Sequence, residues 1–131
     1  MSKSDSDQFP SKEPTLVTVP MPADTNSNGD IFGGWILSQM DIAGAVKAVE
    51  EAKKRVTTVG IDAMSFHKPV YVGDVVSYFC DVARIGNTSI SIKIESWARR
   101  RLSQEPVKVT EGCFTYVALS EDGKATPIKD N

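Results

Sequence analysis

The hydrophobic and polar positions of the chain form one helical pattern followed by several strand patterns. Between Ile31 and Val46 the only charged residue is Asp41, whereas the following sequence KAVEEAKKR is densely charged. A helix at a protein surface normally carries a polar stripe along its whole length. We therefore expect a helix from Gly34 to about Lys54 whose first half is buried nearly all round, wrapped by a sheet, and whose end is solvated.

Four β-rich segments follow the helix, and each is long for a strand, at about ten to twelve residues where about five or six is usual. In the third segment Ile90, Ile92 and Ile94 alternate with polar residues, which predicts one apolar and one polar face. The segments are Val56 to His67, Asp74 to Ile85, Ser89 to Arg100 and Val107 to Ala118, and a short strand from Thr15 to Val19 precedes the helix.

Short connections between these segments favour an antiparallel arrangement. The first connection contains the turn-forming residues Lys68-Pro69 and Gly73-Asp74, and Gly86-Asn87 indicates a tight hairpin. The order of elements predicts an α+β fold in which a strongly curved antiparallel sheet surrounds a single helix. Long sheet edges invite pairing, so we expect a homodimer that extends the sheet across two subunits.

Length and composition agree with this reading. The chain has 131 residues and a net charge of −2, so we expect one domain over residues 15 to 131 and no nucleic acid as the main partner. Residues 1 to 14 are polar and are expected to be flexible, without a secretory signal. No stretch is apolar enough for a membrane span, and Cys80 and Cys113 fit no metal spacing. We expect a cytoplasmic protein.

The single carboxylate in the apolar part of the helix is the first candidate for chemistry. Asp41 lies seven residues after Gly34, close to two turns, so the two share one stripe of the helix. Burying a carboxylate is costly unless it is paired or hydrogen-bonded. The residues alone leave two interpretations: a catalytic group, or a carboxylate satisfied by polar groups across a dimer interface. Asn28 and Asp30, just before the helix, are residue types that cap helices.

Three sequences in this order and spacing closely resemble the hotdog-fold acyl-CoA thioesterases of the YciA-like branch. They are NGDIFGGWILSQMDIAG, VTTVGIDAMSFHKPVYVGD and RIGNTSISIKIESW, and the resemblance covers about Pro20 to Ala118. It implies a hotdog dimer, often gathered into a hexamer as a trimer of dimers. It also implies hydrolysis of acyl-CoA thioesters at the dimer interface, without a metal or a cofactor besides the CoA of the substrate.

Thioester hydrolysis needs an attacking group and donors for the charge that develops on the carbonyl oxygen. The resemblance implies that Asp41 attacks or activates water, and that a backbone amide at the helix start, foremost that of Gly34, binds the oxygen. The position of Asp30 is often Asn in the family, so Asp30 here orients water or caps the helix. We expect Gly34 of one subunit to work with Asp41 of its partner. The predicted catalytic group is Asp41, Gly34, Gly33 and Asp30.

CoA carries phosphates, which call for cationic or amide-rich contacts. The predicted substrate and CoA contacts are Asn28, Phe32, Ser65, His67, Lys68, Arg84, Gly86, Asn87, Thr88 and Ser89. His67 is the only histidine, and it keeps a second hypothesis open, the hydration of an enoyl-CoA with His67 as base. A third hypothesis is a non-catalytic module that binds acyl-CoA.

Overall fold

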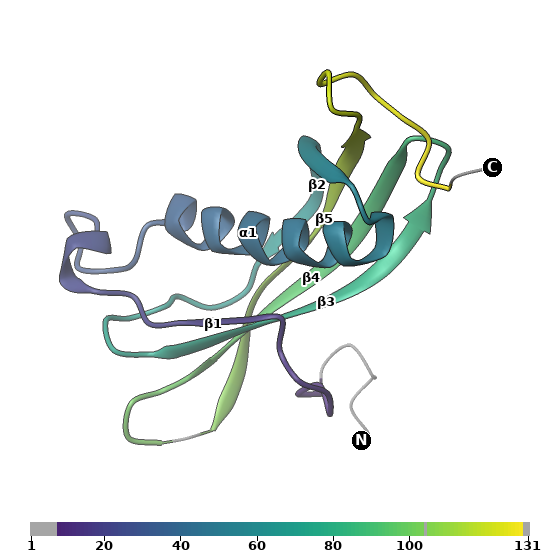
Figure 1. The fold of residues 1–131 in the computed structure, drawn as a ribbon. Coiled ribbons are helices and arrows are strands. Elements are labelled where there is room, and N and C mark those ends of the chain that lie inside the picture. Colours follow the sequence, from purple (N-terminus) through teal and green to yellow (C-terminus); the bar gives the residue numbers. More distant parts are fainter. Residues whose placement is uncertain (1–7, 104, 130–131) are drawn as a thin grey trace.

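The computed structural model describes residues 8–103 and 105–129, and its single sheet and long helix are shown in Figure 1. The strands are ordered β1-β3-β4-β5-β2, and each neighbouring pair is antiparallel. Helix α1 lies across one face of this sheet (Figure 1). In chain order the elements are β1 (Leu16–Thr18), the short 3-10 helix η2 (Pro22–Asp24), α1 (Gly33–Ala52), β2 (Arg55–Phe66), β3 (Val75–Ile85), β4 (Ser89–Arg99) and β5 (Pro106–Leu119).

The predicted order of elements is confirmed, with boundaries that differ by two residues or fewer. The helix begins at Gly33, one residue before the predicted start, and ends at Ala52. Lys53 ends it by adopting a left-handed conformation with φ 59°, from which its N–H donates to the carbonyl of Val49 over 2.8 Å. The unpredicted element is η2, in a segment where prolines had indicated only a loop.

The core lies between α1 and the sheet. Ile90, Ile92 and Ile94 are fully buried, whereas Lys93 between them is exposed, so the predicted alternation is confirmed. The isoleucines join a single cluster with Met40 of the helix. Burying each such side chain contributes about 1.5–3 kcal/mol. This packing fixes the height and rotation of α1 above the sheet.

The expectation that the first half of the helix is buried nearly all round is wrong for the single chain. Met40 is buried against the sheet, but Ile42 and Val46 are 50% and 45% exposed; Val49, in the part expected to be solvated, is 44% exposed. The physical reason is that one curved sheet covers one side of a helix, and the opposite side keeps its apolar residues uncovered. Within the described residues no helix is long and apolar enough to cross a membrane.

The N-terminal segment differs in part from the flexible lead-in expected over residues 1 to 14. The Phe9 ring packs edge-on against Phe79 at 5.3 Å and Trp97 at 5.6 Å between centroids. Lys12 forms an ion pair with Asp81. These contacts cover apolar side chains on the face of the sheet opposite the helix, which anchors residues 8–14; residues 1–7 lie outside the described part of the chain.

One edge of the sheet is long and apolar. Strand β2 has 12 residues and, within residues 8–103 and 105–129, pairs only with β5, so its other edge is open there. Val59 and Ile61 on this strand are 58% and 45% exposed. An open apolar edge of this length is a template for pairing with another strand.

Candidate active site

The loop before α1 is organised by a residue that the sequence interpretation missed. The side-chain Oδ1 of Asn26 accepts the N–H of Asn28 at 2.9 Å and that of Asp30 at 3.1 Å. The N-cap of α1 is Phe32, without a side-chain capping bond. Capping by Asn28 or Asp30 is therefore wrong, because both lie too early in the chain and the Asn26 side chain orders the loop instead. The signal for this turn is the sequence NSNG, since Asn side chains bond to backbone two residues ahead.

The start of α1 presents two free hydrogen-bond donors. Among the described residues, nothing accepts the backbone N–H of Gly33 or Gly34. The next two amides, of Trp35 and Ile36, already donate to the carbonyl of Phe32 at 3.1 and 3.4 Å. A Cβ added to Gly34 would meet nothing within 4 Å. The positive end of the helix dipole is therefore open to the oxygen of a ligand.

A pocket of about 360 Å³ opens beside these donors. Asp30, Gly33, His67 and Lys68 all contribute to its lining, together with the ring of Phe66. The structure thus brings four of the predicted site residues to one place. Besides the glycine, these lining residues are of types that carry a carboxylate, an imidazole and an amine.

The carboxylate of Asp41 is held through one of its two oxygens. The Thr58 hydroxyl of β2 donates to Oδ1 at 2.6 Å, and the Tyr116 hydroxyl of β5 lies 3.1 Å from the same atom. Tyr116 also reaches the backbone oxygen of Asp41 at 3.0 Å. No described residue bonds to Oδ2 of Asp41. The side chain is thereby fixed in direction while one oxygen remains available for water or substrate.

Tyr116 is fully buried and acts as a donor to Asp41. Burial, followed by the negative charge of Asp41, raises the pKa of Tyr116 far above its ordinary value, so the hydroxyl keeps its proton. Its approach to the helix requires Gly44, because a Cβ there would lie 2.2 Å from the hydroxyl oxygen. Neither Tyr116 nor Gly44 was predicted, although a glycine within a helix signals a close approach.

His67 is paired with an acidic partner at the rim of the pocket. Its Nε2 lies 2.8 Å from Oε2 of Glu111, and Nζ of Lys108 lies 3.0 Å from Oε1 of the same residue. Partial burial alone raises the pKa of Glu111, but the hydrogen bonds from Lys108 and His67 outweigh it and hold that pKa below its ordinary value. Glu111 is therefore ionised at neutral pH and restrains the imidazole.

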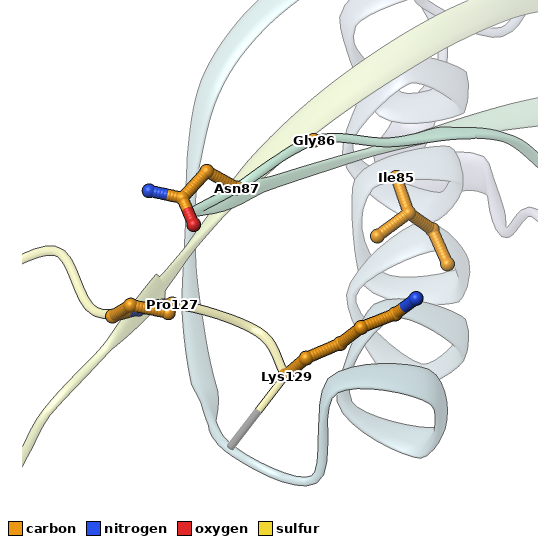
Figure 2. A pocket seen from close by; sticks show the side chains of 5 residues that line it. All are labelled: Ile85, Gly86, Asn87, Pro127 and Lys129. Atoms are coloured by element: carbon orange, nitrogen blue, oxygen red, sulfur yellow. The ribbon is translucent and has the colours of Figure 1, made fainter. Parts of the chain in front are cut away.

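The β3–β4 hairpin lies near the opposite end of α1 from Gly33 (Figure 1). Its Asn87 carbonyl accepts the N–H of Ile128 at 2.9 Å, and Lys54 just past the helix donates to Pro127 at 2.6 Å. A hollow of about 320 Å³ lies between this hairpin and the C-terminal segment. Figure 2 shows its lining side chains, with that of Lys129 extending toward Ile85, the last residue of β3. The C-terminal segment thus fastens the hairpin to the helix end.

The predicted CoA contacts consequently fall into two groups within one chain. Lys68 and His67 lie beside the free amides, whereas the hairpin group lies at the far end of the helix. Phe32 at the helix start is 52% exposed, and Ser65 on β2 is exposed as well. The hairpin group consists of Arg84, Gly86, Asn87, Thr88 and Ser89.

The thioesterase superfamily, as a sequence family, matches residues 28–103, from the loop before α1 to the turn after β4. The chain belongs to the thioesterase superfamily. This thioesterase-superfamily chain is 51% identical over 126 residues to the acyl-CoA thioester hydrolase YciA of Salmonella typhimurium, covering 93% of this chain and 94% of that protein.

Solved structures agree with this family. A hexameric hotdog fold thioesterase of Campylobacter jejuni, Cj0915, is 47% identical with a TM-score of 0.85, over 90% of this chain and 91% of that one. The hexameric thioesterase y2039 of Yersinia pestis is 49% identical with a TM-score of 0.87, over 94% and 100%. The predicted hotdog fold and the predicted YciA-like resemblance are confirmed for this member of the thioesterase superfamily.

Proposed function

We propose that this protein hydrolyses acyl-CoA thioesters to a free acid and CoA. The observation that carries the proposal is the pair of unpartnered amides of Gly33 and Gly34, of which Gly33 lines a pocket. Such donors stabilise the oxyanion of a tetrahedral intermediate in acyl transfer. The similarity to acyl-CoA thioester hydrolases supports the choice of substrate.

Each site is proposed to combine two subunits. At a rise of about 1.5 Å per residue, the seven residues from Gly34 to Asp41 span roughly 10 Å along the helix axis. A reacting carbonyl must lie about 3 Å from its oxyanion donor and about 3–3.5 Å from the attacking atom. The N–H groups at a helix start also point along the axis away from a residue two turns later, so one helix does not present both groups to a single carbon. We therefore infer that Gly34 of one subunit works with the partner subunit's Asp41.

Two uncovered apolar surfaces support this dimer. The open edge of β2 exposes Val59 and Ile61, and the outward face of α1 exposes Ile42, Val46 and Val49. A twofold axis through the β2 edge buries the same surface of both subunits and extends the sheet. In the proposed dimer the two helices run antiparallel, with the start of one beside the middle of the other. The similar hexameric thioesterases support a further assembly as a trimer of dimers.

The proposed chemistry uses the open oxygen of Asp41. In one route the carboxylate removes a proton from water, the resulting hydroxide adds to the thioester carbonyl, and the oxyanion is held by the Gly34 amide. The tetrahedral intermediate then breaks its C–S bond, and the CoA thiolate takes the proton from Asp41. The acid and CoA leave, and Asp41 is again ionised.

In a second route the carboxylate attacks the carbonyl directly. The tetrahedral adduct then expels CoA as its thiolate, which leaves an anhydride between Asp41 and the acyl group. Water hydrolyses the anhydride to the free acid and the Asp41 carboxylate, and the CoA thiolate takes the proton that this step releases. Anchoring through Oδ1 alone is compatible with both routes, because each needs only the other oxygen. A single turnover in heavy-oxygen water separates them, since label in the Asp41 side chain requires the anhydride.

CoA is proposed to contact both groups of predicted residues. Lys68 lies at the pocket and is suited to a phosphate, while Arg84 and the backbone amides of the hairpin supply further donors. Because the two groups lie at opposite ends of one chain, the hairpin is proposed to serve the site that its own Asp41 completes. The CoA arrives with the substrate, and the proposed reaction uses no other cofactor.

A cytoplasmic location is proposed for this activity. Cys80 and Cys113 both carry free thiols, and this protein is similar to the acyl-CoA thioester hydrolase YciA. Unpaired cysteines are usual where thiols are kept reduced.

The His67–Glu111 pair is the observation that favours a second candidate, enoyl-CoA hydration with His67 as base. Hydration consumes the enoyl chromophore without releasing thiol, so the two reactions are separated by absorbance and thiol assays. If the protein hydrolyses thioesters as proposed, His67→Ala raises KM through the lost CoA contact but keeps most of the kcat of thiol release. A module that only binds acyl-CoA releases no thiol from short, medium or long acyl chains.

The direct test of the proposed function measures thiol release from acyl-CoA by the wild type and by Asp41→Asn. The matched control is Asp81→Asn, which removes a carboxylate on the outer face that pairs with Lys12. We expect Asp41→Asn to lose at least about a hundredfold in kcat and Asp81→Asn to match the wild type. Near wild-type turnover by Asp41→Asn contradicts the assigned role.

A further inference from the structure

We propose that the ion pair between Asp74 and Arg100 is a positioning device for the oxyanion-binding amides, a role that rests on the proposed thioester hydrolysis. The pair lies behind the pocket, between the loop that follows β2 and the end of β4. Neither residue lines the pocket, so both act through the backbone that they hold.

Asp74 and Arg100 together bond to the loop over residues 69–74 at several points. Asp74 is 2% exposed, and its Oδ2 accepts from Nη1 of Arg100 and from the backbone N–H of Tyr71, the latter at 2.9 Å. Nη2 of Arg100 donates to the carbonyl of Pro69 at 3.0 Å. The guanidinium also lies 4.9 Å from the centre of the Tyr71 ring. Residues 69, 71 and 74 are therefore held by one carboxylate and one planar cation.

Val70, which lies between Pro69 and Tyr71, links this loop to the start of the helix. Val70 is fully buried, and its carbonyl accepts the N–H of Ile31 at 3.1 Å. Ile31 is two residues before Gly33 and is itself buried. The positions of the Gly33 and Gly34 amides thus depend on a loop that Asp74 and Arg100 hold in place. The same loop contributes Pro69 and Val70 to the pocket wall.

Stability alone is a weak reason for this pair. The Asp74 side chain is 3% exposed and that of Arg100 is 25% exposed, and replacing an ion pair that buries a charge by apolar groups is often neutral or stabilising, because desolvation offsets the attraction between the charges. A guanidinium that donates to two acceptors, here Asp74 and Pro69, instead fixes direction and distance. Displacing a reacting group by about 1 Å can cost about a hundredfold in rate. We therefore expect that weakening this ion pair lowers kcat more than it changes KM.

The first test replaces Arg100 by lysine, which keeps the charge but cannot bond Asp74 and Pro69 through a planar fork. The matched control is Arg99→Lys, one residue earlier. Its guanidinium lies 4.7 Å from the centre of the Phe9 ring, on the face of the sheet opposite the helix. For Arg100→Lys we expect kcat to fall about tenfold with KM within about twofold. For Arg99→Lys we expect both constants to stay within about twofold.

The second readout does not depend on activity. The amide of Ile31 is expected to exchange its hydrogen at least about tenfold faster in Arg100→Lys, because its acceptor on Val70 is no longer held. The amide of Lys53, bonded to Val49 at the far end of α1, is expected to exchange as in the wild type. Asp74→Asn, which keeps an acceptor for Tyr71, is expected to shift kcat and Ile31 exchange in the same direction.

The outcomes separate this proposal from the proposed function. If Arg100→Lys lowers the melting temperature but leaves kcat per folded enzyme and Ile31 exchange unchanged, the pair is only structural and the proposal is overturned. If Asp74→Asn does not fold, the kcat and the Ile31 amide exchange of Arg100→Lys still decide whether the pair positions the helix start. If the wild type releases no thiol from any acyl-CoA, the proposed function fails, whereas Ile31 exchange still reports whether the pair positions the helix start.

Discussion

The hydroxyl of Tyr116 contacts Asp41 twice, 3.1 Å from Oδ1 of the carboxylate and 3.0 Å from the backbone oxygen. A fully buried phenol on the last strand therefore ties down both the side chain and the backbone of the proposed catalytic residue. Thr58, the cross-strand neighbour of Tyr116, bonds the same oxygen, so both described side-chain partners of Asp41 hold Oδ1 and neither holds Oδ2.

Removing that hydroxyl is expected to slow catalysis without removing the carboxylate. Tyr116→Phe leaves Oδ1 of Asp41 with Thr58 alone, so we predict a fall in kcat of about tenfold, measured by thiol release. Tyr78→Phe is the matched control, because Tyr78 is equally buried but bonds to Thr18 at 3.1 Å, away from Asp41. Equal effects of the two substitutions would show that Tyr116 acts only through stability.

Gly44 is expected to tolerate no side chain. A Cβ there would lie 2.2 Å from the Tyr116 oxygen and 2.7 Å from a methyl carbon of Ile94. Gly44→Ala must push the helix or the tyrosine aside, which costs about 1–3 kcal/mol of folding free energy. We predict a lower melting temperature together with a lower kcat. In the double variant Gly44→Ala, Tyr116→Phe the two losses should be less than additive, because the phenylalanine lacks the closest clashing atom.

The two cysteines are predicted to react slowly in the native protein. Burial raises the pKa of the Cys80 thiol to about 11, and burial with the charge of Asp62 raises the pKa of Cys113. Below its pKa a thiol is protonated and unreactive, so labelling of Cys80 should accelerate about tenfold per pH unit between pH 8 and its pKa. We expect slow reaction with an aromatic disulfide at pH 8 and rapid reaction of both cysteines in denaturant. Rapid native labelling at pH 8 would contradict this.

Thr110 is predicted to be a site where removing a polar atom stabilises the protein. Its Oγ1 and the Oγ of Ser96, paired across β4 and β5, are buried without a hydrogen-bond partner among the described residues. Thr110→Val removes an unpaired hydroxyl at constant shape, so we expect about 1 kcal/mol of added stability in thermal melts. Thr115→Val is the control, because its hydroxyl bonds to Ser91 at 3.0 Å. A loss of stability in Thr110→Val would show that water satisfies the hydroxyl.

The elements of the fold were predictable because each rests on a local pattern. Alternation of isoleucines from Ile90 to Ile94 specifies which face of β4 is buried, and the charge-poor run around Asp41 specifies a helix. The uncovered face of α1 was misjudged because periodicity shows that residues are apolar but not which chain covers them. Ile42 and Val49 need a surface that one sheet does not supply.

The candidate site was predictable only in its chemically unusual members. Asp41 and the glycine pair stand out from their neighbours in the sequence, whereas Thr58 and Tyr116 look like ordinary strand residues. They reach Asp41 across separations of 17 and 75 positions, which only strand pairing brings together. Capping by Asp30 was mispredicted because residue type shows what a side chain can bond, and the neighbouring Asn26 had already ordered the loop.

Mixed oligomers test most directly whether Gly34 of one subunit works with the partner subunit's Asp41. Gly34→Pro removes the amide N–H, and proline is tolerated in the first turn of a helix. Alone, Gly34→Pro and Asp41→Asn are each expected to release almost no thiol. A mixed dimer holds one site with both groups intact and one with neither.

The measurement is thiol release after the two variants are unfolded together in equal amounts and refolded, with Asp41→Asn refolded alone as the control. Random pairing makes half of the dimers mixed, each with one intact site of two, so we predict about one quarter of wild-type activity. Activity that stays at the level of the separate variants would contradict the shared site and place both groups in the same chain.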